Sequence, residues 1–445
     1  MRDYQQVADA VAADIATGRL RPGDRLPPQR DFARQQGIAN STAARVYKEL
    51  SHRGLTVGEV GRGTFVRAVG RVAGPAPGEP TDHGINLALN YPTVPEQAGL
   101  LAAGLDKLLR PDVMDSVLRP VGAAGTPALR RAAAELLARG GWRPDPARVL
   151  FAGNGRQAIS AAITALVPPG ARLGAEELTY PALNAIAGHL GITVVPLAMD
   201  GAGVIPEAVA AAHRSAPLHA VYVQPTLHNP LSLTMPWERR TELAEVLTRW
   251  GIYAVEDIIW AFLYDDLPPL AALAPEHTVV VDSLSKRIAP GLTAGFAAVP
   301  GPIVTGMTAA LHSRGWTPSR FALEAAAQWQ ADGAVSAVVR AKQRAALARQ
   351  EVAERHLGDF TVRTDPRSYF CWWQLPPAWR ADMFVAAAAR QGIAVTPAAA
   401  FSVGLSRSPN AIRIGLASPQ LDVLSRALAT LAELARSVPD DLVTD

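Results

Sequence analysis

The sequence predicts an α/β protein made of two folded parts: a small N-terminal module and a large domain with a mostly parallel sheet. Three observations support this prediction. The chain has 445 residues, which is too long for one compact domain. A Gly- and Pro-rich stretch at residues 69–84 shows no apolar period and reads as a linker between parts at 1–68 and 85–445. Beyond it, strands are expected at 149–151, 178, 193–196, 220–223, 253–256, 278–281 and 296–299. They alternate with Ala- and Leu-rich helical segments, a pattern typical of a sheet covered by helices on both faces.

Composition and charge limit the classes of function. Hydrophobic residues make up 49% and charged residues 19%, which suits a soluble globular protein. The single cysteine, Cys371, excludes an internal disulfide framework and fits the cytoplasm. No stretch approaches the ~18 apolar residues of a membrane span, and no signal-peptide pattern is present, so we expect no membrane partner. Residues 1–71 carry 12 Lys and Arg against 7 Asp and Glu, whereas the remainder carries 31 against 33. A nucleic-acid partner is therefore expected for the first part only.

The N-terminal module shows the pattern of three helices followed by a hairpin. The expected elements are helices at 4–17, 29–36 and 40–53, and strands at 55–57 and 64–66. Gly37 ends the second helix, and Asn40-Ser41-Thr42 supplies an N-cap for the third. A glycine turn at 61–63 joins the strands. These elements make a winged helix-turn-helix.

In this fold the second helix of the motif enters the major groove of double-stranded DNA. The candidates for base contacts are Asn40, Ser41, Thr42 and Arg45, and those for phosphate or minor-groove contacts are Arg30, Lys48 and Arg62. The segments GDRLPPQRDFA and GRGTFV resemble the GntR-family DNA-binding domain. That resemblance implies further contacts from Arg25 and from the wing tip, which includes Gly63. A small helical domain that binds protein is the alternative.

Four groups suited to ligand binding fall where predicted strands end, the edge at which ligands bind such sheets. Gly155 and Arg156 follow a glycine turn and open a helix, which is an anion site strengthened by the helix dipole. Tyr180 can stack on a flat ring, and Asn229 can donate to a phenolate oxygen. Asp257 can pair with a protonated pyridine nitrogen. Taken singly, each pattern is better explained as an ordinary turn or core residue.

Lys286 lies in the turn Ser283-Leu284-Ser285-Lys286, after a valine-rich strand. A lysine at the mouth of a sheet can be desolvated and act as a nucleophilic amine toward an aldehyde. Ser283 and Ser285 can bind a phosphate carried by the same ligand. A surface lysine on a serine-rich turn is the alternative.

The order of these groups, with Ala289-Pro290-Gly291-Leu292 after the lysine, resembles the fold-type I aminotransferases that depend on pyridoxal 5'-phosphate (PLP). It is most similar to the aminotransferase-like domain of MocR/GabR-type regulators, a subfamily of the GntR transcription regulators. The resemblance implies that Lys286 binds PLP covalently and that Arg413 grips the carboxylate of an amino acid. It also implies a homodimer and a smaller C-terminal subdomain from about residue 320.

Several positions depart from that pattern. Thr293 stands where relatives often carry a phosphate-binding arginine, and Trp260 stands where a tyrosine is common. Asn154 replaces a usual glycine, and Pro120 replaces a tyrosine that reaches the partner subunit's phosphate. Arg287 or Arg156 is expected to supply the missing phosphate charge. These changes put efficient transamination in doubt, whereas the lysine, aspartate and asparagine of the pattern are intact.

The expected function is a PLP-dependent DNA-binding transcription regulator whose large domain senses an amino acid, an amine or the cofactor itself. Two alternatives remain open. One is an active PLP-dependent aminotransferase with an appended DNA-binding module. The other is a DNA-binding protein whose large domain has lost the cofactor and only dimerises. No metal site is expected, and the sequence leaves open the effector, the operator and the direction of regulation.

Overall fold

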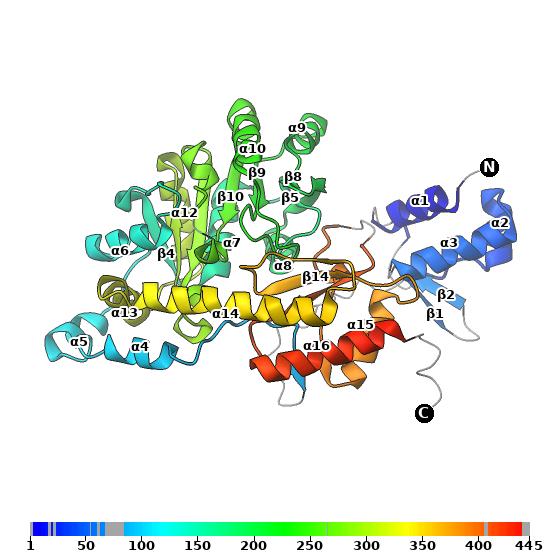
Figure 1. The fold of residues 1–445 in the computed structure, drawn as a ribbon. Coiled ribbons are helices and arrows are strands. Elements are labelled where there is room, and N and C mark those ends of the chain that lie inside the picture. Colours follow the sequence, from blue (N-terminus) through cyan, green and yellow to red (C-terminus); the bar gives the residue numbers. More distant parts are fainter. Residues whose placement is uncertain are drawn as a thin grey trace. The chain divides into compact units, whose positions relative to one another are not determined.

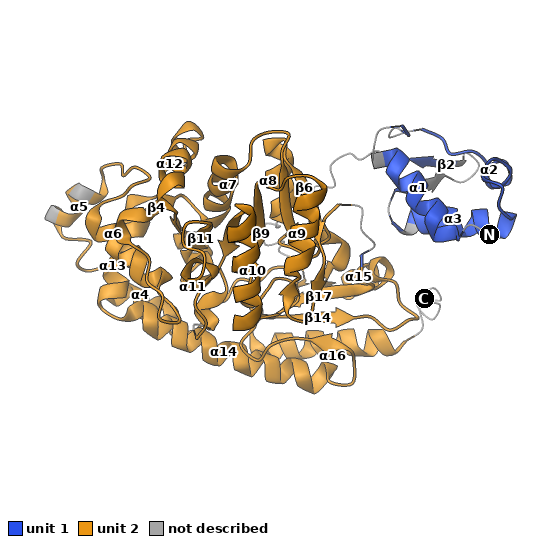
Figure 2. Cartoon of the chain, turned by 90° about the horizontal axis from the view of Figure 1, so that it is seen from above, with its two compact units in different colours: residues 1–79, 405–408 blue, residues 80–404, 409–445 orange. Residues whose placement is uncertain are grey.

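The computed structural model describes residues 3–16, 19–20, 24–53, 55–59, 63–66, 84–264, 266–404 and 408–437. The chain divides into two compact units, coloured separately in Figure 2. The first contains residues 1–79 and 405–408, and the second contains residues 80–404 and 409–445. Within the described residues, no helix has the length and apolar character needed to cross a membrane.

The first unit has the predicted order of three helices and two antiparallel strands. They are α1 (Tyr4–Ala16), α2 (Gln29–Gln36), α3 (Asn40–His52), β1 (Thr56–Glu59) and β2 (Gly63–Val66). Ala43, Val46 and Leu50 of α3 are completely buried, as their spacing predicts. Gly37 adopts φ +64°, a left-handed conformation that glycine accepts without strain, and this ends α2 one residue earlier.

Two details of the first unit differ from expectation. Ala39 occupies the N-cap position of α3, and no side chain caps the helix, so the predicted Asn40-Ser41-Thr42 cap is wrong. Asn40 is already helical, which leaves its side chain exposed rather than turned back on the backbone. Arg25 also forms a bridge with Phe65, and the Leu26 amide donates to the Thr64 carbonyl at 2.8 Å. The segment before α2 therefore extends the hairpin.

The second unit contains a seven-stranded sheet in the order β4-β12-β11-β10-β9-β5-β6. The strands are β4 (Val149–Ala152), β5 (Arg172–Glu176), β6 (Thr193–Leu197), β9 (Ala220–Val223), β10 (Tyr253–Asp257), β11 (Thr278–Ser283) and β12 (Gly295–Ala298). Neighbours are parallel except that β12 is antiparallel to both β11 and β4. The predicted mostly parallel sheet is confirmed, and its parallel strands end on one edge.

Helices cover both faces of this sheet (Figure 1). One apolar core joins the sheet to α7 (Gly155–Leu166), α8 (Ala182–Leu190) and α12 (Val304–Ser313). Cores on the opposite face join it to α6 (Pro127–Leu137), α9 (Pro206–Ser215), α10 (Trp237–Trp250) and α13 (Arg320–Ala331). The short helices α4 (Gln97–Ala103) and α5 (Pro111–Val117) precede α6, and β7 (Met199–Asp200) pairs with β8 (Gly203–Val204). The unbroken valines of β11 match its burial on both faces.

Strand β5 is missing from the sequence prediction, which places a strand at Leu178 instead. Its sequence, RLGAE, begins and ends with a charged residue and contains a glycine, so it lacks the β-branched run of its neighbours. Tertiary contacts account for the charged residue at each end of β5. Arg172 donates to main-chain carbonyls of the α9 C-terminus, and Glu176 is buried against His228, with 3.2 Å between Oε2 and Nε2. Leu178 forms only an isolated bridge to Ser402.

A smaller subdomain follows the long helix α14 (Ala334–Leu357), which runs lengthwise across the lower half of the unit in Figure 1. Its antiparallel sheet has the order β13-β14-β17-β16, formed by β13 (Val362–Arg363), β14 (Phe370–Gln374), β16 (Thr396–Pro397) and β17 (Ala411–Gly415). Helices α15 (Ala381–Arg390) and α16 (Leu421–Arg436) cover it. The segment that opens the unit, β3 (Ile85–Asn86), pairs with β15 (Ile393–Ala394) of this subdomain.

Candidate functional site

Lys286 lies in the four-residue helix α11 (Leu284–Arg287), directly after β11. Its Nζ donates to the Asn90 carbonyl at 2.6 Å and lies 4.4 Å from the ring centre of Tyr91 and 5.4 Å from that of Trp260. Burial, together with the nearby charges of Arg413 and Arg156, lowers the pKa of Lys286 to about 7. An amine with this pKa is largely unprotonated just above neutral pH, the state in which it is a nucleophile.

Two hydroxyls and a helix N-terminus meet beside this lysine. The Oγ atoms of Ser283 and Ser285 are 2.8 Å apart. A Cβ added to Gly155 would lie 3.2 Å from Ser283 Oγ, so glycine allows the first turn of α7 to approach the serine closely. Asn154 caps α7, because its Oδ1 accepts from the Gln157 amide at 3.0 Å. Hydroxyls together with the amides of a helix start form an anion site suited to a phosphate.

Asp257 ends β10 and is buried with partners of its own. Its Oδ2 accepts from the Tyr222 hydroxyl at 2.6 Å and from Gln224 Nε2 at 3.0 Å, and Oδ1 accepts from the Ile259 amide at 3.0 Å. Burial raises the pKa of Asp257, and these hydrogen bonds oppose that shift. The carboxylate of Asp257 therefore has three protein donors besides any ligand that it binds. Oδ1 still has room for one more donor, such as a ring N–H.

Gln224 connects Asp257 to Asn229. Its Nε2 donates to the carboxylate, and its Oε1 accepts from the Asn229 amide at 3.1 Å. Asn229 Oδ1 is buried with no hydrogen-bond partner among the described residues. In the loop between β5 and α8, the Tyr180 hydroxyl accepts from Arg156 Nε at 2.8 Å. The structure thus brings Tyr180 and Arg156 together and holds Asn229 close to Asp257.

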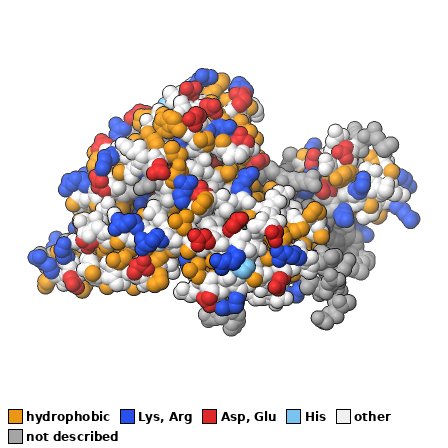
Figure 3. Space-filling model, viewed as in Figure 1, with side chains coloured by type: hydrophobic (Ala, Val, Ile, Leu, Met, Phe, Trp, Pro, Cys, Tyr) orange, Lys and Arg blue, Asp and Glu red, His pale blue; other side chains and the backbone are white. Residues whose placement is uncertain are grey.

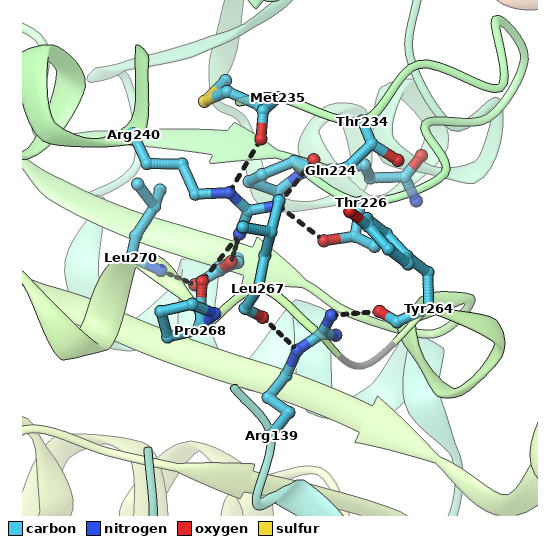
Figure 4. A network of polar contacts seen from close by, with 12 residues as sticks. Arg139, Gln224, Thr226, Thr234, Met235, Arg240, Tyr264, Leu267, Pro268 and Leu270 are labelled. Carbon is cyan, nitrogen blue, oxygen red and sulfur yellow. Dashed lines mark hydrogen bonds and ion pairs between the residues drawn. The ribbon is translucent and has the colours of Figure 1, made fainter. Parts of the chain in front are cut away.

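Buried arginines fix the loops behind these groups (Figure 4). Arg240 is completely buried and donates to the carbonyls of Pro225, Met235 and Pro268 and to the Thr226 hydroxyl. Its charge lies 3.6 Å from the carboxylate of Glu256, the residue before Asp257. Arg139 donates to the carbonyls of Tyr264 and Leu267. The Asn229 loop and the end of β10 are therefore anchored by the same guanidinium group.

Arg413 lies on β17 and reaches the same region from the smaller subdomain. It is 7% exposed, donates to the Ala88 carbonyl and to Thr396 Oγ1, and lies over the Phe401 ring. Burial lowers the pKa of Arg413 to about 10, and its Nε has no hydrogen-bond partner among the described residues. A buried guanidinium with a free N–H can bind a carboxylate.

Arg287 does not take the position expected for a phosphate-binding arginine. It donates to Asp282 Oδ2 at 2.6 Å and lies over the Phe262 ring. Its charge is therefore compensated by Asp282, although its backbone follows Lys286. Thr293, at the position of the missing arginine, has a buried hydroxyl without a partner among the described residues. Of the two arginines expected to supply phosphate charge, Arg156 is the one without a carboxylate partner in the part of the chain that the structure describes.

The proposed DNA contacts lie together on the first unit. Arg25, Arg30, Asn40, Ser41 and Arg45 are exposed, and Thr42 is half-buried. Arg45 lies over the ring of Tyr4, at 5.6 Å from its centre. Gly63 begins β2, whereas Arg62 lies outside the described residues. The first two turns of α3 therefore present polar side chains and a basic residue on the outer face of the helix.

Several residues of the site were not identified from the sequence. Tyr222 and Gln224 carry a recognisable signal, because they are alternate positions at the end of a buried strand that point toward the same neighbour. Asn90 and Tyr91 carry none, because they lie almost two hundred positions from the lysine they contact. The completely buried Lys342 of α14, which donates to the Lys286 carbonyl at 2.9 Å, resembles an ordinary helix-surface lysine in the sequence.

The fold and this lysine-centred site define a class of two-part protein, in which a winged helix-turn-helix precedes an aminotransferase-like domain. Residues 82–431 match the aminotransferase class I and II family, and residues 3–66 match the gntR family of bacterial regulatory proteins. The chain therefore belongs to the aminotransferase class I and II family and carries a gntR-type module at its N-terminal end.

Similar proteins share this organisation. YdeF of Bacillus subtilis (strain 168), an HTH-type transcriptional regulator, is 29% identical over 436 residues, which cover 97% of this chain and 94% of the relative. PdxR of Corynebacterium glutamicum, an HTH-type pyridoxine biosynthesis transcriptional regulator, is 24% identical over 440 residues and covers 96% and 95%. The kynurenine aminotransferase structure of Pyrococcus horikoshii matches with a TM-score of 0.72 at 21% identity, over 80% of this chain and 91% of that one, which shows the shared fold.

The side chains of the site fit PLP. The two serines and the α7 amides suit its phosphate, and Asp257 suits its ring nitrogen. Buried polar atoms of Asn229, Thr293 and Arg413 lack protein partners, as expected for groups that contact a ligand. No group of His, Cys, Asp and Glu in the described residues has the arrangement of a metal site.

Proposed function

We propose that this chain is a PLP-dependent DNA-binding transcription regulator whose aminotransferase-like domain senses a small amine, an amino acid or the cofactor itself. The observation that carries the proposal is the presence, in one chain, of a winged helix with an exposed polar α3 start and a site centred on a desolvated lysine. The protein acts in the cytoplasm as a homodimer. A twofold axis suits paired half-sites on operator DNA.

DNA recognition is assigned to the first unit. The first turn of α3 places Asn40, Ser41 and Thr42 at base edges, with Arg45 one turn further along the same helix. Arg25 and Arg30 lie before and at the start of α2 and bind phosphates, together with Arg62 at the wing. In Figure 3, acidic and basic side chains are interspersed on the visible face of the larger unit. That distribution favours phosphate binding by the small module rather than by the large one.

PLP binding and effector binding are assigned to the larger unit. When bound, PLP supplies an aldehyde carbon at which one primary amine replaces another. Ser283, Ser285 and the α7 amides hold the phosphate, Asp257 pairs with the ring nitrogen, Asn229 contacts the phenolic oxygen and Tyr180 packs on the ring. Lys286 supplies the protein's own amine. Arg413 binds the carboxylate of an effector that has one.

A regulator benefits from weak turnover, because a complete reaction would consume the effector. Trp260 occupies the position where active relatives carry a tyrosine. It is buried against Tyr369 and Phe370, and an indole ring offers no phenolic hydroxyl. Residual transamination is the only enzymatic activity that this site supports. Turnover at an ordinary enzyme rate of ~10 per second, without an effect of amines on DNA binding, would instead indicate an aminotransferase.

The decisive experiment is footprinting of the purified full-length protein on the DNA upstream of its own gene. Reactions with and without PLP are compared, each with a panel of amines and amino acids. Protection of paired sites that changes with an amine in the PLP-loaded protein supports the proposal. Absence of any protection at low salt would contradict the assignment of the first unit.

A further inference from the structure

The opening segment of the larger unit, residues 85–91, is bonded to the smaller subdomain along its length. We call it the strap. Ile85 and Asn86 pair with β15, and the Gly415 amide of β17 donates to the Leu87 carbonyl at 2.6 Å. Arg413 donates to the carbonyl of Ala88. The strap therefore moves with the smaller subdomain, although it precedes the whole large domain in sequence.

The far end of the strap contacts Lys286. The Asn90 carbonyl accepts from Lys286 Nζ at 2.6 Å, and the Tyr91 ring lies 4.4 Å from the same atom. Asn90 uses its side chain for a different contact, because its Oδ1 accepts from the Ala417 amide at 3.1 Å. Asn90 thus joins the lysine of the large domain to the segment between β17 and α16.

Further bonds tie the same two segments together. The Tyr91 amide donates to Ser418 Oγ at 3.2 Å, and that hydroxyl donates to the Leu89 carbonyl at 3.3 Å. Helix α14 is bonded both to the turn that carries Lys286 and to the segment that follows β17. Its Lys342 donates to the carbonyls of Lys286 and Ile288, and its Arg349 donates to the Leu416 carbonyl at 3.0 Å. These bonds fix the backbone around Lys286. A change in what Nζ is bonded to therefore alters its contacts with the strap rather than the position of the turn.

We propose that the free amine of Lys286 latches the strap through Asn90, and that this latch transmits ligand binding from the site to the chain segment leading to the winged helix. The proposal rests on the proposed function. An uncombined Nζ keeps at least two N–H groups, so it can donate to Asn90 whether or not it is protonated, and its protonated form is also attracted to the Tyr91 ring. An Nζ bonded covalently to the cofactor would keep at most one N–H group and would be tied to the ligand, so the bond to Asn90 would be lost.

The latch gives the two states of Lys286 different energies, as a switch requires. A hydrogen bond from a charged donor to a buried carbonyl is among the stronger kinds in proteins. The strap begins directly after Gly84, and residues 67–83 join Gly84 to the winged helix in the sequence. A change in the strap can therefore be passed along the chain to the winged helix. An effector amine that releases Lys286 would therefore close the latch and restrain the start of the linker.

The test is hydrogen–deuterium exchange of the full-length, PLP-loaded protein before and after treatment with hydroxylamine, the probe that frees Lys286. Amides of residues 87–91 and 416–418 are expected to exchange about tenfold more slowly after treatment, the effect of one strong hydrogen bond. Asn90→Ala keeps the main-chain carbonyl that accepts from Lys286 but removes the side-chain bond to Ala417, and Ser418→Ala removes the bond to the Tyr91 amide. Each variant is therefore expected to remove most of the difference at residues 416–418 while residues 87–91 still respond. Asn410→Ala is the matched control, because Asn410 makes the same kinds of bond to residues 379–381, away from the strap.

An unchanged exchange rate after hydroxylamine in the wild type would overturn the latch, and so would a full difference at residues 416–418 retained in both Asn90→Ala and Ser418→Ala. Failure of the proposed function looks different. In that case strap protection responds to hydroxylamine, whereas DNA affinity responds to neither PLP nor any amine.

Discussion

Lys342 and Lys286 are linked by a hydrogen bond of 2.9 Å from the ammonium of the first to the main-chain carbonyl of the second. Lys342 also donates to the Ile288 carbonyl at 2.6 Å. A buried lysine on α14 thereby anchors the turn that carries Lys286. Both lysines are desolvated, and burial lowers the pKa of each to about 7.

This pair predicts how the stability of the cofactor-free protein depends on pH. An unfolded lysine titrates near its ordinary value of 10.5, whereas the buried form titrates near 7. Between these values the unfolded chain binds more protons, so the free energy of unfolding rises with pH, by at most ~1.4 kcal/mol per unit for one lysine. Lys342→Met should flatten the rise between pH 7 and 9 in denaturant unfolding. Exposed Lys107→Met is the control, and an equal rise in Lys342→Met and wild type would refute the assignment.

The low pKa of Lys286 predicts when it reacts. Covalent attachment of PLP, followed by its near-visible absorbance, should accelerate as pH rises through about 7, because only the unprotonated amine attacks. Lys286→Ala should abolish the absorbance while circular dichroism shows an intact fold. A covalent adduct that survives reduction in Lys286→Ala would show that another lysine carries the cofactor.

Asp257 is predicted to hold the cofactor through its charge. Asp257→Asn keeps the shape of the side chain but removes the carboxylate that stabilises a protonated ring nitrogen. We expect cofactor affinity to fall at least about tenfold, since a hydrogen bond to a charged group contributes ~1.5–3 kcal/mol. Tyr222→Phe removes one of the three donors to Asp257 and should cost less. Dissociation constants from cofactor fluorescence measure both, and equal affinity of Asp257→Asn and wild type would contradict the assigned role.

The proposed DNA contacts are of two kinds, and substitutions of each kind should change DNA binding in a different way. Arg30→Ala and Arg62→Ala should weaken binding to all sequences and lower the slope of log affinity against log salt by about one unit each. Arg34→Ala is a useful control, because Arg34 is paired with Asp31. Asn40→Ala or Thr42→Ala should instead change base preference, by ~1–3 kcal/mol per contact. If neither Arg30→Ala nor Arg62→Ala lowers this slope, other residues must make the phosphate contacts.

The strand and helix pattern predicted most of the fold because buried strands and amphipathic helices leave clear periods in the sequence. The predicted strand at 220–223 matches β9, and those at 253–256 and 278–281 fall within β10 and β11. The direction of β12 and the existence of β5 were not predicted. Pairing direction leaves no period, and β5 depends on the tertiary partners of Arg172 and Glu176.

The site was predictable where its residues follow strands, as Asp257, Asn229 and Lys286 do. It was not predictable where distant segments meet. Asn90 reaches Lys286 only because the strap is bonded to the smaller subdomain, and Arg287 turns away only because Asp282 is buried beside it. Such contacts depend on tertiary packing rather than on local sequence.

The central claim, that a lysine-centred site controls DNA binding, is tested most directly by measuring the operator affinity of the full-length protein with PLP and candidate amines, beside the Lys286→Ala variant. The account predicts that an amine changes the affinity of the PLP-loaded wild type and leaves that of Lys286→Ala unchanged. Equal responses of the two proteins, or no response in the wild type to any amine or to PLP, would contradict it.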